Sequence, residues 1–221
     1  MKSKILALAV AVTLAVAGNS FADSTILVTQ HNLMMRNSNL TQPCAFCHTP
    51  HNASKASKAP LWNRTLPNGA LFTLYSSNTA KNRLYKSGFT ASSASLGCMS
   101  CHDGGTIGGR IINAPAEVPE GTPITADVIG VGKKNFGYDL TNHHPVNFNI
   151  DDTANAGIVS KFGITTEGLT LYKTGRPITG GGDNGTGIEC STCHNSHDNS
   201  FGKFLRKSNA GSSLCLTCHI K

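Results

Sequence analysis

The sequence of 221 residues is short of the residues that build an ordinary hydrophobic core. Hydrophobic residues make up 39% of it, aromatic residues 6% and charged residues 14%. Since burial of apolar surface is the main driving force of folding, a conventional core in this chain would be thin. Beyond the N-terminal segment there is also no apolar run near the roughly 20 residues that a membrane-spanning helix needs. The mature chain is therefore predicted not to span a membrane.

The longest apolar run lies at the N-terminus, directly after a basic start. It extends from Ile5 to Ala17, and Ser20-Phe21-Ala22 places small residues where signal peptidase cleaves. This order of segments is typical of a secretory signal peptide, here residues 1–22. No cysteine stands at the cleavage point, so a lipid anchor is not indicated. We expect an exported protein whose mature part, residues 23–221, suffices for one domain or two small ones.

Cysteine is absent outside four copies of one pattern, Cys-x-x-Cys-His. The copies are motif 1 (Cys44, Cys47, His48), motif 2 (Cys98, Cys101, His102), motif 3 (Cys190, Cys193, His194) and motif 4 (Cys215, Cys218, His219). Two thiols at this spacing can both bond to the vinyl groups of one porphyrin, and the next imidazole then lies under the iron as proximal ligand. Four copies with no cysteine left over predict four covalently bound c-type haems.

Two other interpretations of these cysteines are weaker. In an exported chain the pairs could be disulfides or thioredoxin-like redox pairs, but neither explains a histidine after every second cysteine. Zinc is the other alternative, because Cys44, Cys47, His48 and His51 resemble a Cys2His2 set. A structural zinc finger, however, separates its cysteine and histidine pairs by about a dozen residues, so that two elements can close on the ion.

Distal ligands for the irons would have to come from outside the motifs. The histidines outside them are His31, His51, His143, His144 and His197. Four irons need four distal ligands, so these candidates nearly saturate the requirement. Methionine, the usual rival, is limited in the mature chain to Met34, Met35 and Met99, and the last lies between the cysteines of motif 2. Bis-histidine ligation is therefore favoured throughout.

These histidines differ in what their positions predict. His51 and His197 each follow a motif histidine by three residues, on the same side of a helical turn, so each is expected to ligate the iron of a neighbouring haem. His144 is also favoured, because a proline fixes the chain just after it. His143 is the spare candidate. His31 lies on a short arm near the mature N-terminus, and it either closes a pocket of its own chain or docks in the next subunit.

The sequence is basic, with a formal net charge of +7, which by itself would suggest an acidic partner or nucleic acid. Removal of the signal peptide leaves 17 basic and 12 acidic residues, or +5. Each haem would bring two propionates, and their neutralisation explains the excess better. No basic stripe interleaved with aromatic residues is present, so nucleic acid is not expected as a partner.

The chain divides into three stretches around its motifs. Residues 23–110 carry motifs 1 and 2, residues 111–188 contain no cysteine, and residues 190–221 carry motifs 3 and 4. Short β-prone pieces occur at 126–131 and 146–150, and glycine-rich runs flank the middle stretch as loops. We expect a helical turn at each motif. The predicted fold class is a multihaem cytochrome c, a mostly irregular chain with short helices and few small strands wrapped around four covalently bound haems.

Three further segments accompany the motifs: His31-Asn32-Leu33 ahead of motif 1, His144-Pro145-Val146 in the middle, and Phe204-Leu205-Arg206 between motifs 3 and 4. In these markers the chain resembles the doubled-CXXCH cytochromes. In size and motif layout it is most similar to extracellular tetrahaem cytochromes of the outer-membrane cytochrome E type, which polymerise into conducting filaments. This resemblance implies a filament of identical subunits, with His31 as an arm that reaches the next subunit.

The expected function is electron transfer, not enzymatic catalysis, because six-coordinate iron has no open position for a substrate. Its partner would be a redox protein or an extracellular acceptor, and its location the cell surface or the extracellular space, with the periplasm as the alternative. Two other functions stay open. One is a soluble periplasmic electron shuttle, which differs in assembly alone. The other is a multihaem reductase with one open haem site.

Overall fold

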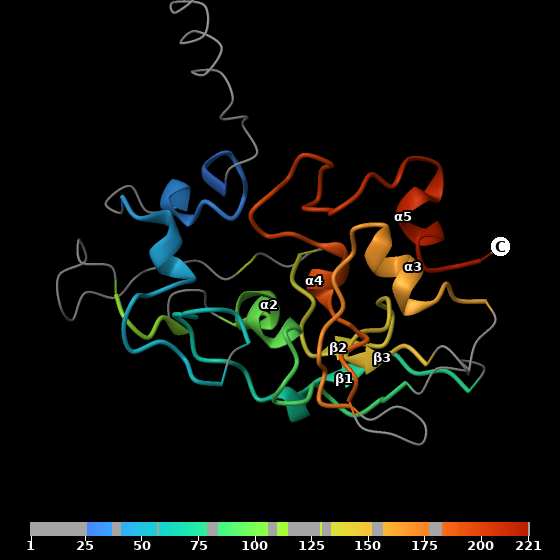
Figure 1. Cartoon of the computed structure of the whole chain (residues 1–221). Helices are drawn as coiled ribbons and strands as arrows, with labels where there is room; N and C mark the ends of the chain where they lie inside the picture. Colours follow the sequence, from blue (N-terminus) through green and yellow to red (C-terminus); the bar gives the residue numbers. More distant parts are fainter. Residues whose placement is uncertain are drawn as a thin grey trace, which may run out of the picture.

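The computed structural model describes residues 26–36, 41–56, 58–78, 84–105, 110–114, 129, 134–151, 157–176 and 183–220 (Figure 1). The predicted signal peptide lies outside the described residues, as does the β-prone piece at 126–131 apart from Ile129. Within the described part most of the chain is irregular, as predicted. No helix in these ranges is long and apolar enough to cross a membrane.

The regular elements are short. The α-helices of the described residues are α2 (Ser95–His102), α3 (Lys161–Thr166), α4 (Cys190–Cys193) and α5 (Ser213–Leu216). The 3-10 helices are η1 (Ile26–Val28), η2 (Leu33–Arg36), η3 (Pro43–Phe46), η4 (Gly69–Leu71) and η6 (Ala210–Ser212). The strands are β1 (Thr73–Leu74), β2 (Asp139–Leu140), β3 (Phe148–Asn149) and β4 (Gly187–Ile188). The β-prone piece at 146–150 is thus confirmed by β3.

Every Cys-x-x-Cys-His motif coincides with a helical turn, which confirms that prediction. Motif 2 lies in α2, while motifs 1, 3 and 4 begin in η3, α4 and α5 and end just after them. In motifs 1, 3 and 4 the backbone N–H of the histidine donates to the carbonyl of the first cysteine, at 2.8, 3.1 and 2.9 Å. Such a bond spans one helical turn, so the first cysteine and the histidine lie on the same side of it.

Two small sheets hold the motifs in place. β1 pairs with β2 in parallel, with Leu74 opposite Leu140, and β3 pairs with β4 in antiparallel fashion, with Phe148 opposite Ile188. Each sheet anchors one small hydrophobic cluster. The first consists of Phe72, Leu74, Phe89, Leu96, Met99 and Leu140, and the second of Phe148, Ile150, Ile164, Leu169 and Ile188. The thin core expected from composition is therefore present, as two separate patches.

The segment between α4 and α5 reaches away from its own helices. In Figure 1 this red segment extends toward the blue 3-10 helices of the N-terminal part. The contact is direct, because the ring of Phe204 stacks on the ring of His31 at a centroid distance of 4.2 Å. Segments at the two ends of the described chain thus meet at one site.

Candidate functional site

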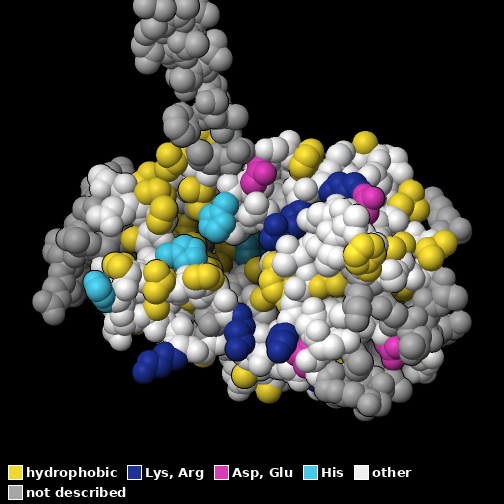
Figure 2. All heavy atoms as spheres, viewed as in Figure 1, with side chains coloured by type: hydrophobic (Ala, Val, Ile, Leu, Met, Phe, Trp, Pro, Cys, Tyr) yellow, Lys and Arg dark blue, Asp and Glu magenta, His cyan; other side chains and the backbone are white. Residues whose placement is uncertain are grey.

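Histidine rings meet in pairs in the described chain. Each pair joins a motif histidine to a histidine from outside the motifs. The pairs are His31–His102 at 6.3 Å between ring centroids, His48–His197 at 6.0 Å and His144–His219 at 6.3 Å. Figure 2 shows several histidine side chains on one face of the molecule, among hydrophobic side chains.

The spacing of these pairs fits a metal ion held between the rings. Two imidazoles that bind opposite sides of one metal, each at about 2 Å through a ring nitrogen, have their ring centres roughly 6 Å apart. The observed separations of 6.0 to 6.3 Å match this value. The pairs therefore suit a six-coordinate iron with one motif histidine and one distal histidine.

Backbone contacts at Nδ1 leave the other ring nitrogen, Nε2, of these histidines available. The Nδ1 atoms of several histidines lie within hydrogen-bond distance of backbone carbonyl oxygens: His48 with Pro60 (2.7 Å), His102 with Lys134 (2.6 Å), His194 with Lys203 (2.9 Å), His31 with Ser196 (3.2 Å) and His144 with Pro145 (2.9 Å). Metal-binding histidines commonly donate their other N–H in this way, which fixes the tautomer and the ring orientation. Nε2 is then left for the iron.

Protonation favours the same role. Burial lowers the pKa of His31, and it also lowers the pKa of His144. Both side chains are thus held in the neutral form, which is the form that binds a metal. The nearby carbonyls of Ser196 and Pro145 oppose this effect but do not outweigh it.

The space beside motif 1 also suits a porphyrin. A surface cavity of about 540 Å³ is lined by Cys44 and His48 together with Pro43, Ala45 and Leu61. The first cysteine and the histidine of the motif thus face one largely apolar space. That is the side on which a porphyrin bonded to the cysteine and ligated by the histidine would lie.

The cysteines of the four motifs are not bonded to one another, and several of them are partly buried. All eight lie among the described residues, and no disulfide joins any two of them. Burial raises the pKa of Cys47 to about 12 and that of Cys193 to about 11. The side chains of Cys98 and Cys190 lie within hydrogen-bond distance of each other, so motif 2 is next to motif 3.

Three histidines remain outside the pairs. No other histidine ring contacts the ring of His194, although all nine histidines are described. His51 and His143 are exposed, and neither ring contacts a motif histidine. The ring of His143 instead packs edge-on against Phe136, which stacks on His102. Motif 3 is thus the motif whose histidine has no second histidine ring beside it among the described residues.

The partial repeat of motifs 1 and 3 extends into their surroundings. His48 forms an isolated bridge with Trp62, and His194 forms one with Leu205. In both cases the backbone N–H of the residue after the motif histidine donates to the carbonyl of the residue just before the bridge partner, at 2.8 and 2.7 Å. Those two positions, Leu61 and Phe204, both have positive φ angles, of 53° and 58°. The same local fold therefore supports both proximal ligands.

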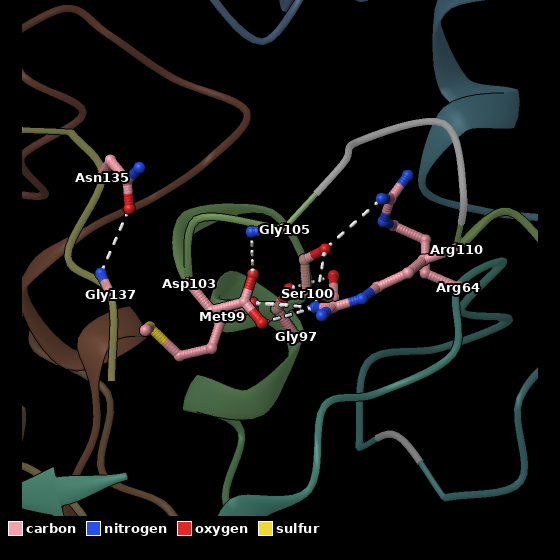
Figure 3. A network of polar contacts seen from close by, with 9 residues as sticks. All are labelled: Arg64, Gly97, Met99, Ser100, Asp103, Gly105, Arg110, Asn135 and Gly137. Atoms are coloured by element: carbon pink, nitrogen blue, oxygen red, sulfur yellow. Dashed lines mark hydrogen bonds and ion pairs between the residues drawn. The ribbon is translucent and has the colours of Figure 1, made fainter. Parts of the chain in front are cut away.

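Arginines bind the backbone of three motifs. Arg64, which is fully buried, donates to the carbonyls of Phe46 in motif 1 and Ser100 in motif 2. Arg110 also donates to Ser100 and forms an ion pair with Asp103 at 2.7 Å, as Figure 3 shows. In motif 3, Nε of Arg206 donates to the carbonyl of Ser191 at 2.7 Å. Helical turns leave carbonyls without partners at their C-terminal ends, and cations suit that position.

The sequence did not predict the role of Arg64, nor that of a buried carboxylic acid next to motif 3. Glu189 is 1% exposed and accepts hydrogen bonds from the hydroxyls of Ser93 and Ser95 and from Nδ2 of Asn147. Burial raises the pKa of Glu189, and the hydrogen bonds partly offset this. In the sequence, Glu189 is notable only because it directly precedes a motif cysteine, and no pattern in the sequence points to Arg64.

The C-terminal part of the chain has recognisable relatives. Residues 183–221 match the family described as Doubled CXXCH motif (Paired_CXXCH_1). This match supports a multihaem c-type cytochrome. It contains motifs 3 and 4, and its motifs indicate covalently bound c-type haem. No curated protein matches the chain.

Proposed function

We propose that this multihaem cytochrome is an exported tetrahaem subunit of an extracellular electron-conducting filament, and that it has no substrate chemistry of its own. Each motif would hold one haem through its two cysteines and its histidine. His31, His144 and His197 would supply distal ligands to motifs 2, 4 and 1 within the same chain. When bound, the haem supplies an iron that accepts and releases single electrons.

The ring pairs support electron transfer as the function. Iron between two histidines has no vacant position for a small molecule, so it can exchange electrons but cannot activate a substrate. The His48–His197 pair further joins motif 1 to the segment that follows motif 3. A haem whose distal ligand belongs to the segment after another motif is held close to the haem of that other motif. Electron transfer along a row of haems requires this closeness.

His31 takes the first of its two expected roles in this proposal. Its ring lies edge-on to His102 of its own chain, its Nδ1 atom lies 3.2 Å from the carbonyl of Ser196, and Phe204 stacks on one of its faces. A histidine held by three contacts in its own chain is not free to serve as an arm to the next subunit.

One observation carries the filament proposal: among the described residues, the exposed His194 has no histidine ring as partner. Two other exposed histidines of the described chain, His51 and His143, are also unpaired. A distal ligand from a second copy of the chain, either His51 or His143, would complete the motif 3 site. Such a contact joins different surfaces of two identical subunits, and repetition of a contact that does not close produces a filament. The repeat favours His51, because His197 occupies the same position after motif 3.

Two alternatives give different states of the motif 3 iron. In a soluble shuttle, His51 or His143 of the same chain completes the site. In a reductase the motif 3 site stays open. The reductase is favoured by one feature, which is that His194 is the motif histidine without a partner ring among the described residues. The proposed location is the cell surface or the extracellular space, and the proposed partners are identical subunits and a redox protein or extracellular acceptor.

Carbon monoxide binding to the reduced protein separates these functions. The filament proposal expects about one carbon monoxide per dissociated monomer, none per assembled subunit, and loss of assembly in either His51→Ala or His143→Ala. A monomer that binds no carbon monoxide and does not assemble would establish the shuttle. An assembled or soluble form that binds carbon monoxide and reduces nitrite or hydroxylamine would establish the reductase.

A further inference from the structure

The angles between paired histidine rings divide the sites into two kinds. In the His48–His197 pair the ring planes differ by 27°. In the His31–His102 and His144–His219 pairs they differ by 73° and 79°. The ring planes are therefore nearly parallel at motif 1 and nearly perpendicular at motifs 2 and 4.

Ring orientation matters because each axial imidazole interacts with one of two iron d orbitals that point between the porphyrin nitrogens. Parallel rings act on the same orbital and split the two in energy. Perpendicular rings act on one orbital each and leave them nearly equal. Low-spin ferric iron then gives a rhombic electron paramagnetic resonance signal in the first case and a highly anisotropic signal with a large maximum g value in the second.

Phe204 is placed to set the orientation of His31. The two rings stack at 4.2 Å with planes only 22° apart. The carbonyl of Ser196 fixes the direction of Nδ1 at 3.2 Å. An imidazole with one bonded nitrogen can still turn about its bond to iron, and a flat ring stacked on its face prevents this rotation.

The backbone around Phe204 is unusual. Gly202, Lys203 and Phe204 all have positive φ angles, of 71°, 51° and 58°. Bulky residues rarely adopt such angles and almost never in succession, because the side chain approaches the backbone too closely. The strain is held by Asn199, whose Oδ1 accepts from the N–H of Phe204 at 2.8 Å. Strained turns of this kind are often kept where function requires a fixed side chain.

The same turn contacts two sites. The carbonyl of Lys203 lies 2.9 Å from Nδ1 of His194, the motif 3 ligand, while the ring of the next residue covers His31, opposite motif 2. A shift of the turn would therefore disturb two ligands together. On the other side of motif 2, Phe136 stacks on His102 with planes 26° apart, so both rings of this pair have an aromatic backing.

We propose that Phe204 is the positioning residue for His31, and that it fixes the axial rings of motif 2 near the perpendicular arrangement. The motif 2 haem then differs electronically from the motif 1 haem. This inference rests on the proposed ligand set, in which His31 and His102 share one iron. It assigns a role to the side chain in addition to that ligand set.

Electron paramagnetic resonance of the fully oxidised holoprotein tests the proposal. The wild type should show both kinds of low-spin signal, a rhombic one from motif 1 and highly anisotropic ones from motifs 2 and 4. Phe204→Leu should lose one anisotropic signal, or shift it toward the rhombic kind, while haem content and carbon monoxide binding stay unchanged. Phe204→Tyr, which can still stack, should restore the wild-type spectrum.

The matched control is Phe201→Leu, because Phe201 is a neighbouring phenylalanine that is 53% exposed. Its spectrum should equal that of the wild type. If Phe204→Leu fails to take up haem, Asn199→Ala replaces it, since loosening the turn should broaden the same signal. Purely rhombic low-spin signals in the wild type, or identical spectra for Phe204→Leu and Phe204→Tyr, would overturn the role of Phe204. High-spin iron at motif 2 would overturn the proposed ligand set instead.

Discussion

The ring centroids of His197 and His48 lie 6.0 Å apart, so the histidine that follows motif 3 is next to the histidine of motif 1. The two rings are 27° from parallel, and Nδ1 of His48 is held at 2.7 Å from the carbonyl of Pro60. A single iron between them would tie the C-terminal motifs to the N-terminal part of the chain. Ligation at this site would therefore contribute to tertiary stability as well as to electron transfer.

Replacing His197 by alanine should open the distal side of motif 1. Since a carbon monoxide molecule can bind an iron that has lost its sixth ligand, the reduced monomer should bind one more carbon monoxide than the wild type. Absorption spectroscopy during titration measures this. The control is Phe201→Leu, because the side chain of Phe201 is exposed and belongs to the same segment after motif 3. An unchanged stoichiometry in His197→Ala would remove His197 from the ligand set.

Replacing Arg64 by leucine should destabilise the contact between motifs 1 and 2. Its guanidinium is fully buried, and it donates to the carbonyls of Phe46 and Ser100 at 3.5 and 3.3 Å. Both bonds are long, so we expect a loss of about 2 kcal/mol, near the cost of leaving a buried acceptor without its partner. Guanidinium denaturation of the holoprotein, followed by circular dichroism, gives the free energy of unfolding. Lys58→Leu at an exposed position is the control, and an equal loss there would refute a specific role.

Replacing Glu189 by glutamine should change how stability depends on pH. Burial raises the pKa of this carboxyl above the ordinary value of about 4.3. The folded state therefore favours the protonated form, and its stability is greatest below the ordinary pKa and falls as pH rises through the raised one. Glu189→Gln stays neutral and should lose this fall. The free energy of unfolding, measured at several pH values from 4 to 8, tests the claim, and parallel curves for both proteins would contradict it.

Removal of haem should unfold most of the chain. The hydrophobic clusters of the described residues are small, and the conformational entropy of the chain opposes folding at every residue. Replacing Cys190 and Cys193 by alanine should abolish haem attachment at motif 3 and expose the C-terminal third to proteases. Limited proteolysis with mass spectrometry identifies the cleavage sites. A compact, protease-resistant variant without that haem would show that the polypeptide folds by itself.

The sequence by itself determined whatever depends on a few adjacent residues. A Cys-x-x-Cys-His motif fits within one helical turn, so it predicted the turns, the attachment residues and the proximal ligands without knowledge of the fold. The low hydrophobic content likewise predicted a mostly irregular chain with a thin core. These features follow from local geometry and composition, which the order of residues encodes directly.

Only the tertiary structure decided how the histidines pair. His31 and His102, or His48 and His197, come from distant parts of the chain, and the +3 position of His197 predicted a neighbouring haem but not which one. The roles of Arg64 and Phe204 also depend on the burial and ring contacts that folding creates. Many chain paths can join the same motifs, and long-range packing selects one of them. Ring angles, buried charges and the partnerless ring of His194 follow from that selection.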